Sequence, residues 1–193
     1  MNGLPLIQII VASTRRQRRG AAIAGWFADV AAERGDLGID VVDLLELSLP
    51  PLTDATPPMS GESRDPGAQE WSAKVAAADG YVVVTPEYNH GYPAPLKNAL
   101  DHLFAEWSRK PIGFVSYGAA GGGVRAVEQL RQVAIELDMV PVRRQVAIAR
   151  VWGALDEHGT LREPPTDQAE ALLDDIVWWA RTLRGGRTVA AAA

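Results

Sequence analysis

The sequence predicts a three-layer α/β protein in which a parallel, five-stranded sheet is doubly wound with strand order 2-1-3-4-5. Short apolar runs of strand length alternate along the chain with segments whose apolar residues recur at helical spacing. That alternation is typical of βαβ units, in which a crossover helix joins parallel strands. The length of 193 residues suits a single well-buried core. We therefore expect one domain over residues 1–184 and a flexible tail over residues 185–193.

The expected strands are rich in apolar residues, many of them β-branched, and most are bounded by glycine, proline or polar clusters. They are Leu6–Val11, Ile39–Leu44, Tyr81–Thr85, Ile112–Ser116 and Val142–Ile148. The expected helices carry apolar residues three and four positions apart, which is the stripe of a core-facing helix. They cover Gly20–Arg34, Gly67–Asp79, Pro95–Ser108, a segment whose stripe begins at Val124, and Pro165–Leu183.

Bulk composition argues against several functional classes. The net charge of −5 and pI near 5.2 disfavour general binding of nucleic acid, which usually needs a basic face. The absence of cysteine excludes disulfides, zinc–thiolate sites and thiolate catalysis, and the three dispersed histidines form no metal-binding motif. No apolar run approaches membrane-spanning length, and the first residues lack a signal-peptide pattern. We expect a cytoplasmic protein that binds neither nucleic acid nor membrane.

The predicted strand order brings the loops after strands one, three and four to the same edge of the sheet, where open α/β sheets bind ligands. The first loop, residues 12–20, leads into a helix N-terminus, where free N–H groups favour an anion. It contains two hydroxyls and four arginines, whose planar guanidinium groups bind phosphate oxygens at two points. It matches neither the P-loop nor the dinucleotide-binding pattern. A phosphate monoester site is the functional interpretation, and a solvated basic loop is the alternative.

The second and third loops offer flat and unshielded surfaces. In the second, residues 86–93, prolines stiffen both ends and Tyr88 and Tyr92 present flat apolar faces, a mixture that suits a planar heteroaromatic ring. The alternative is a turn in which Asn89 and Gly91 serve geometry alone. In the third, residues 117–123, consecutive glycines let a ligand approach the backbone closely, although such turns also serve simply to relieve steric strain.

The stretch Pro86-Glu87-Tyr88-Asn89-His90-Gly91 closely resembles the signature of the NADPH-dependent FMN reductase family, whose members have a flavodoxin-like fold. Ala12-Ser13-Thr14-Arg15 resembles the phosphate loop G-S-x-R of that family, with Ala12 in place of the usual glycine. We expect the extra methyl group to tighten the phosphate cradle and weaken FMN retention. The resemblance implies that the FMN phosphate is held by Ser13, Arg15 and Arg18, that the isoalloxazine is lined by Pro86, Glu87, Tyr88 and Asn89, and that its other edge meets Tyr117, Gly118, Gly121 and Gly122.

The activity implied by the resemblance is hydride transfer from NADPH (or NADH) to FMN, followed by reduction of a small-molecule acceptor such as a quinone, an azo or nitro compound, a metal ion or free flavin. The cofactor carries this chemistry, so no catalytic acid–base pair is expected from the protein. Arg16 or Arg19 is a candidate for contacting the 2′-phosphate of NADPH. The alternatives are a non-enzymatic flavin carrier or flavin-sensing interaction protein, and a protein that binds another phosphorylated metabolite without redox chemistry.

Assembly is the last expectation from the sequence. Family members are commonly dimers or tetramers, and apolar Leu103 and Trp107, taken as exposed on their helix, fit a homodimer or homotetramer. Trp178 and Trp179 are adjacent on the last helix and cannot both point inward equally, so another subunit is a candidate to cover one of them. The proline-rich connection Leu49–Pro66 is long enough to be a lid or an interface element.

Overall fold

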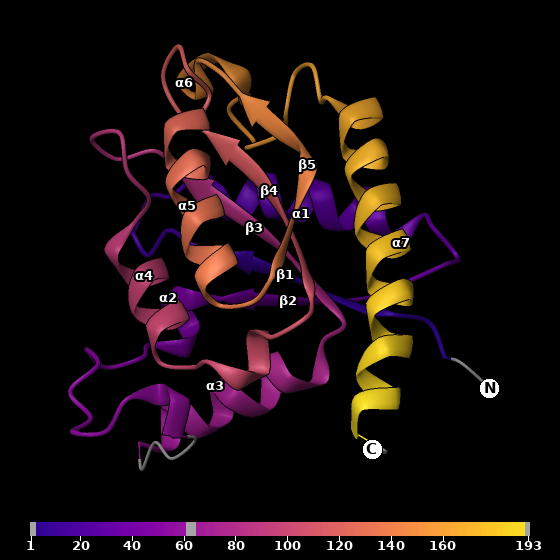
Figure 1. Cartoon of the computed structure of the whole chain (residues 1–193). Coiled ribbons are helices and arrows are strands. Elements are labelled where there is room, and N and C mark those ends of the chain that lie inside the picture. The colour runs from indigo at the N-terminus through magenta and orange to yellow at the C-terminus, as the bar shows by residue number, and fades with distance from the viewer. Residues whose placement is uncertain (1–2, 61–64, 192–193) are drawn as a thin grey trace.

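The computed structural model describes residues 3–60 and 65–191 and contains one parallel five-stranded sheet (Figure 1). Its strand order is β2-β1-β3-β4-β5, which confirms the predicted doubly wound topology. All four neighbouring pairs are parallel. The strands are β1 Leu6–Val11, β2 Gly38–Asp43, β3 Gly80–Pro86, β4 Pro111–Tyr117 and β5 Val140–Ile148.

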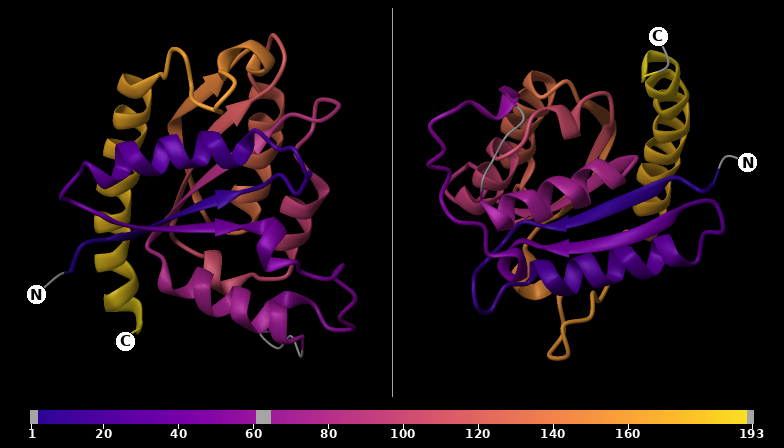
Figure 2. Two further views of the ribbon diagram at one scale, coloured as in Figure 1. Left: turned by 180° about the vertical axis from the view of Figure 1, so that it is seen from behind. Right: turned by 90° about the horizontal axis from the view of Figure 1, so that it is seen from below.

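Helices cover both faces of the sheet and make the three layers (Figures 1 and 2). One face packs against α1 and α7, and the other packs against α3, α4 and α5. Two short helices, α2 and α6, lie in the connections after β2 and β5. The helices are α1 Gly20–Ala32, α2 Leu44–Leu47, α3 Pro66–Ala77, α4 Ala94–Asp101, α5 Val124–Glu136, α6 Val151–Ala154 and α7 Thr166–Ala191, with 3₁₀ turns η1 Pro58–Ser60 and η2 Ala105–Trp107.

Alternation along the strands divides the core into two hydrophobic clusters. In β1, Ile7 and Ile9 face the α1/α7 side, whereas Ile10 faces the α3/α4/α5 side. Both central strands, β3 and β4, are buried along their whole length, as expected where helices cover both faces of a parallel sheet. The two clusters fix the strands, and so fix where the loops at their carboxyl ends lie.

Helix α4 ends earlier than the sequence predicts, and this overturns the expected exposure of Leu103 and Trp107. The helix stops at Asp101, and the chain turns back through η2, which buries both side chains. Trp107 is fully buried and donates its indole N–H to the carbonyl of Leu100 at 3.2 Å. Trp71 similarly donates to the carbonyl of Ala99 at 2.8 Å. Two indoles thus satisfy carbonyls that the end of α4 leaves open, and neither Leu103 nor Trp107 is available to a second subunit.

The expected tail over residues 185–193 is also different, because α7 continues through both glycines to Ala191. Arg184 donates to the carbonyl of Gly3 at 3.0 Å, and Arg187 donates to the carbonyl of Arg109 at 2.7 Å and to Asp79 at 2.9 Å. These bonds attach the end of α7 to the sheet and offset the low helix propensity of glycine. Residues 192 and 193 lie outside the described range.

The proline-rich connection is attached to α4 over its first residues. The side-chain amide of Asn98 donates to the carbonyl of Pro50 at 2.8 Å and accepts from the backbone N–H of Leu52 at 2.9 Å. The imidazole of His102 also bonds the Pro50 carbonyl, at 2.9 Å. Residues 61–64 of this connection lie outside the described residues, and its role as a lid or interface element stays a prediction.

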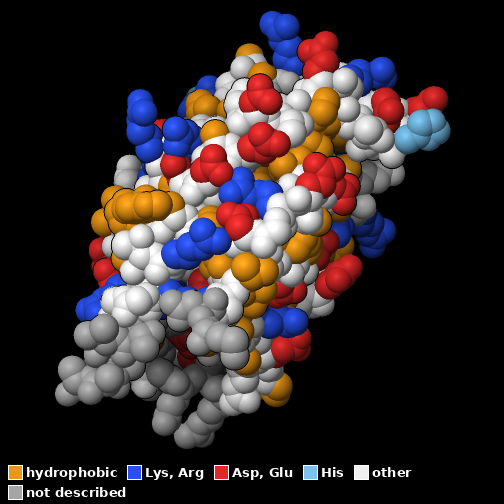
Figure 3. All heavy atoms as spheres, turned by 90° about the vertical axis from the view of Figure 1, so that its right-hand side faces the viewer, with side chains coloured by type: hydrophobic (Ala, Val, Ile, Leu, Met, Phe, Trp, Pro, Cys, Tyr) orange, Lys and Arg blue, Asp and Glu red, His pale blue; other side chains and the backbone are white. Residues whose placement is uncertain are grey.

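The surface over α7 carries acidic and basic side chains intermixed around scattered apolar groups (Figure 3). Among the described side chains of this face no single sign of charge dominates, and they form no basic stripe of the kind that nucleic-acid binding usually requires. Among the described residues, no helix has the length and apolarity to cross a membrane.

Candidate functional site

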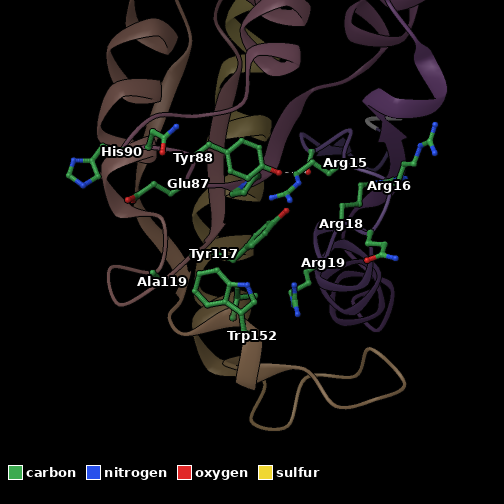
Figure 4. A pocket seen from close by; sticks show the side chains of 16 residues that line it. Arg15, Arg16, Arg18, Arg19, Glu87, Tyr88, His90, Tyr117, Ala119 and Trp152 are labelled. Atoms are coloured by element: carbon green, nitrogen blue, oxygen red, sulfur yellow. Dashed lines mark hydrogen bonds between the residues drawn. The ribbon is translucent and has the colours of Figure 1, made fainter.

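A cavity of about 680 Å³ opens at the carboxyl edge of the sheet, where the three predicted loops meet (Figure 4). Its volume lies within the usual range for small-molecule and cofactor sites. Residues from the loops after β1, β3 and β4 and from α6 line it. They are Ser13, Arg15, Arg16, Gln17, Arg18, Arg19, Pro86, Glu87, Tyr88, Asn89, His90, Tyr117, Gly118, Ala119, Val151 and Trp152. Every cofactor contact that the resemblance implies is therefore brought together here except Gly121 and Gly122.

The first loop ends at a helix N-terminus that the protein leaves uncapped. Helix α1 begins at Gly20 with no side-chain cap and no acidic residue in its first turn. Its first N–H groups and the positive end of its dipole therefore remain suited to an anion. Ala12 does not intrude, because its methyl group is fully buried in the hydrophobic cluster beneath α3 and α4. The expected tightening of the phosphate cradle by Ala12 is wrong for that reason.

Arginine side chains form one wall of the cavity. Arg18 is paired with Asp43, whose other oxygen caps α2 through the N–H of Leu45 at 3.0 Å. This pair fixes the guanidinium, yet its Nε is buried and has no hydrogen-bond partner among the described residues. A buried N–H of this kind is costly unless a ligand accepts from it. Among residues 3–60 and 65–191, Arg15, Arg16 and Arg19 have no carboxylate within ion-pair distance.

Aromatic side chains form the facing wall, and Figure 4 shows Tyr88, Tyr117 and Trp152 in succession along it. The hydroxyl of Tyr88 hydrogen-bonds the buried Ser13 hydroxyl at 2.7 Å, and the guanidinium of Arg15 lies 5.7 Å from the Tyr88 ring centroid. Burial raises the pKa of Tyr117, and the neighbouring Tyr88 acts in the same direction. Tyr117 is therefore a neutral phenol at physiological pH, so its hydroxyl can donate a hydrogen bond to an anion and does not repel it.

The absence of a side chain at Gly20 leaves room for this phenol, because a Cβ at this position would lie 2.7 Å from the Tyr117 hydroxyl oxygen. The phenol thus occupies the space directly beside the first turn of α1. A sequence pattern cannot show this approach, because the two residues are far apart along the chain. Gly20 is a position beside the candidate site that we did not single out from the sequence.

The second loop is held rigidly against α5. Glu87, with its side chain 7% exposed, forms an ion pair with Arg125 and accepts from the backbone N–H of that residue at 3.3 Å. Gln129 donates to the carbonyl of His90 at 3.0 Å. Asn89 and His90 both have left-handed backbones, with φ of 49° and 70°. The carboxylate of Glu87 is therefore engaged with α5, and the loop offers the cavity mainly Tyr88, Asn89 and backbone groups.

The third loop contributes Tyr117, Gly118 and Ala119, while its glycine run makes the turn into α5. Gly122 and Gly123 have φ of 59° and 89°, which favours glycine at both positions. Gly122 packs against the backbone of β5, where its added Cβ would lie 3.2 Å from the nitrogen of Ala149. The structure therefore assigns this pair to chain geometry rather than to the cavity wall.

Sequence reasoning missed α6, which follows β5 and completes the rim. The backbone N–H of Arg150 bonds the carbonyl of Ala119 at 2.8 Å, and that of Val151 bonds the carbonyl of Gly118 at 3.0 Å. These bonds hold the backbone at Trp152 beside the third loop, and this residue is 65% exposed at the mouth of the cavity. The available signal was position, since Trp152 follows a parallel strand and so lies at the ligand-binding edge.

Comparison with known proteins decides the family. Residues 5–153 match the family model described as NADPH-dependent FMN reductase. The chain belongs to the NADPH-dependent FMN reductase family. It is 39% identical to an NAD(P)H-dependent FMN reductase of Schizosaccharomyces pombe over 161 residues, and this alignment covers 79% of each chain. It is 29% identical over 191 residues to a 2-hydroxy-1,4-benzoquinone reductase of a Burkholderia species, which covers 92% of this chain and 97% of the relative.

A solved structure of similar fold is the flavoenzyme NAD(P)H:(acceptor) oxidoreductase FerB of Paracoccus denitrificans. It aligns with a TM-score of 0.73 at 19% identity and covers 93% of this chain and 98% of its own. At that identity the likeness shows the flavodoxin-like fold alone. Family membership, by contrast, shows that the protein is an oxidoreductase that uses FMN and NAD(P)H.

The cavity fits FMN on physical grounds. A phosphate monoester needs hydrogen-bond donors and positive charge, and an uncapped helix, a buried Arg18 Nε without a partner and the unpaired Arg15 supply both. A flavin ring needs a flat apolar surface with a few polar groups, and Tyr88 and Tyr117 supply one beside Asn89. The hydrogen-bond donors and the aromatic wall face each other across one cavity. A molecule such as FMN, which carries both a phosphate and a flat ring, needs this arrangement.

Proposed function

We propose that this protein transfers electrons from NADPH, through FMN bound in the cavity at the carboxyl edge, to a small-molecule acceptor of the quinone type. The observation that carries the proposal is the pairing of an arginine wall with an aromatic wall in one open cavity. When bound, FMN would supply the two-electron redox chemistry that the protein's own side chains lack.

The protein residues bind and orient rather than react. Ser13, Arg15 and Arg18 hold the phosphate with the first turn of α1, and the Arg18–Asp43 pair fixes one guanidinium in advance. Tyr88 and Asn89 support the ring on a loop that the Glu87–Arg125 pair fixes to α5. Holding the ring in one place raises the rate by fixing the orientation of the two substrates that meet it.

Quinones are the acceptor class best supported. The Burkholderia relative, which spans nearly the whole chain, is a 2-hydroxy-1,4-benzoquinone reductase, and NADPH:quinone oxidoreductases of Oryza sativa and Arabidopsis thaliana match about half of the chain. A quinone is flat, and its carbonyl oxygens gain negative charge on reduction. The cavity provides both an aromatic wall and unpaired guanidinium groups for such a molecule.

The decisive experiment is the visible absorption spectrum of protein reconstituted with FMN, recorded before and after anaerobic addition of NADPH. A protein-bound flavin band that bleaches, and that recovers when a benzoquinone is added, is the expected result. Bound flavin that stays oxidised would favour a flavin carrier or sensor over a reductase. Failure to bind FMN would contradict the assignment of the cavity and favour another phosphorylated metabolite.

The protein is further proposed to be a homodimer or homotetramer. With Leu103 and Trp107 buried, the support comes from α7, where Trp178 is 59% exposed and makes an edge-to-face contact with the partly buried Trp179. A large exposed indole on a long helix suits a subunit contact better than solvent. Light scattering should show an oligomer that Trp178→Glu converts to smaller species. A wild-type monomer at working concentration would contradict this proposal.

A further inference from the structure

The arginine wall carries more positive charge than one FMN phosphate requires. Arg15, Arg16 and Arg19 have no carboxylate partner in the described part of the chain, and α1 adds its own positive end. A phosphate monoester brings at most two negative charges, and Ser13, Arg15 and Arg18 already surround its expected place. Arg19 is only partly exposed and would remain desolvated without a partner.

Arg19 and Trp152 share one end of the cavity. Figure 4 shows them opposite each other, with Arg15 and Tyr88 at the other end and with Arg16 directed away from the cavity centre. The backbone beside Trp152 is fixed to the third loop by the bonds that the N–H groups of Arg150 and Val151 make to Ala119 and Gly118. An exposed indole beside an unpaired guanidinium can stack on a planar base and bind a phosphate attached to it.

We propose that Arg19 and Trp152 form a second subsite that binds the 2′-phosphoadenosine part of NADPH and so favours NADPH over NADH. This inference rests on the proposed function, because it takes FMN to occupy the Ser13–Arg18 end of the cavity. Trp152 stacks on the adenine, and Arg19 pairs with the 2′-phosphate that NADH lacks. Of the two arginines that the sequence offered for this role, the structure selects Arg19, since Arg16 points outward.

The test is a calorimetric titration of the FMN-loaded protein with two fragments, 2′,5′-ADP and 5′-AMP, which differ only in the 2′-phosphate. Wild type is expected to bind 2′,5′-ADP at least tenfold more tightly, because a charge-assisted contact is worth about that factor or more. Arg19→Ala should remove the difference, and Arg19→Lys should restore part of it. Trp152→Ala should weaken both fragments by about tenfold, whereas Trp152→Phe keeps a stacking surface.

Controls separate this subsite from the FMN site. Arg143 on β5 is exposed and has no carboxylate partner among the described residues, so Arg143→Ala removes a positive charge elsewhere and should leave the fragment preference intact. FMN affinity, followed by flavin fluorescence, should change less than about threefold in Arg19→Ala. In steady-state assays, the ratio of KM for NADH to KM for NADPH should fall toward one in the same variant.

Three results would overturn the inference. The first is equal affinity of wild type for the two fragments, and the second is an unchanged preference in Arg19→Ala. The third is simultaneous loss of FMN and 2′,5′-ADP in Arg19→Ala, which would assign Arg19 to the FMN phosphate instead. Failure of the proposed function has a different signature, since wild type would then not bind FMN at the start of the titration.

Discussion

The two edges of the sheet differ in how far their charged side chains are paired within the chain. At the amino edge, Asp79 accepts from the backbone of Leu6 at 3.1 Å and from Arg187 at 2.9 Å, and it lies 3.3 Å from a nitrogen of Arg184. Lys110 donates to the carbonyl of Val75 at 2.8 Å. At the carboxyl edge, Arg18 pairs with Asp43, whereas Arg15, Arg16 and Arg19 have no carboxylate partner within residues 3–60 and 65–191. The end of α7 lies at the first of these edges, opposite the strand arrowheads (Figure 1).

This difference separates stability from function within one sheet. Charges that pair within the chain stabilise the folded state. Partly buried charges without a partner raise the free energy of the folded state until a ligand neutralises them. Substitutions at the carboxyl edge should therefore change ligand affinity, and substitutions at the amino edge should change stability.

The largest expected effect is on FMN binding in the double variant Arg15→Ala/Arg18→Ala. Each guanidinium offers the phosphate a charge-assisted contact worth about 1.5–3 kcal/mol, so the pair should cost about 100-fold or more in FMN affinity. Fluorescence titration with FMN measures it. Arg109→Ala is the matched control, because Arg109 lies at the amino edge in a long, exposed ion pair of 3.8 Å. FMN affinity equal to that of wild type would refute the phosphate assignment.

The next effect tests whether the glycine run serves geometry. Gly123→Ala places a Cβ 2.8 Å from that of Ser116 at a φ of 89°, so it should destabilise the fold by about 3 kcal/mol. Gly121→Ala is the control, because its nearest contact would be 3.5 Å away and its φ is not left-handed. Urea unfolding of both variants measures the difference. A drop in FMN affinity in stable Gly121→Ala would instead return this residue to the cofactor site.

The sequence predicts those parts of the site that have local signals. Strand limits follow from apolar runs, and the positions of the first and second loops follow from arginines and prolines directly after such runs. Trp152 was missed because it is an exposed apolar residue on a four-residue helix, which shows no periodicity. Gly20 was missed because its role depends on Tyr117, which only the folded sheet brings to it.

The wrong expectations share a cause, which is that tertiary contacts overrode local propensity. Helical spacing alone predicts that the helix after the second loop continues to Ser108. The helix ends earlier, and the indole N–H groups of Trp71 and Trp107 donate to carbonyls of its last turn. The two glycines alone predict that the last helix ends near Leu183. Instead it continues, and Arg184 and Arg187 attach its last turns to the amino edge. The bonds of Trp71, Arg184 and Arg187 join residues far apart in sequence, where no periodic pattern predicts them.

A smaller effect is expected at Asp79, whose side chain is 15% exposed. Asp79→Asn removes the charge that pairs with Arg184 and Arg187, so it should destabilise the fold by about 2 kcal/mol without changing FMN affinity. Asp138→Asn is the control, because the Arg109–Asp138 pair is exposed and should contribute about 0.5 kcal/mol or less. Equal loss in both variants would remove the distinction between buried and exposed pairs at this edge.

Lys110 gives the smallest effect and the clearest dependence on pH. Burial, reinforced by the positive charge of Arg187, lowers the pKa of Lys110 to about 8, against the opposing pull of Asp79 and Glu106. Below pH 8 the folded and unfolded chains both keep this proton, and the cost of burying the charge is fully present. Above pH 8 the folded chain loses its proton first, while the unfolded chain keeps it to about pH 10.4. Stability therefore rises with pH across this window.

The expected gain from Lys110 is about 1 kcal/mol between pH 8 and pH 9, since one pKa unit corresponds to about 1.4 kcal/mol. Urea unfolding at the two pH values measures it, and Lys110→Met should abolish this part of the slope while keeping the length of the side chain. The buried tyrosines do not interfere in this range, because burial raises the pKa of Tyr81 and Tyr117 above the ordinary value near 10. A slope that persists in Lys110→Met would show that the amino edge does not hold this lysine desolvated. That result would weaken the contrast between an amino edge whose charges have partners within the chain and a carboxyl edge whose arginines await a ligand.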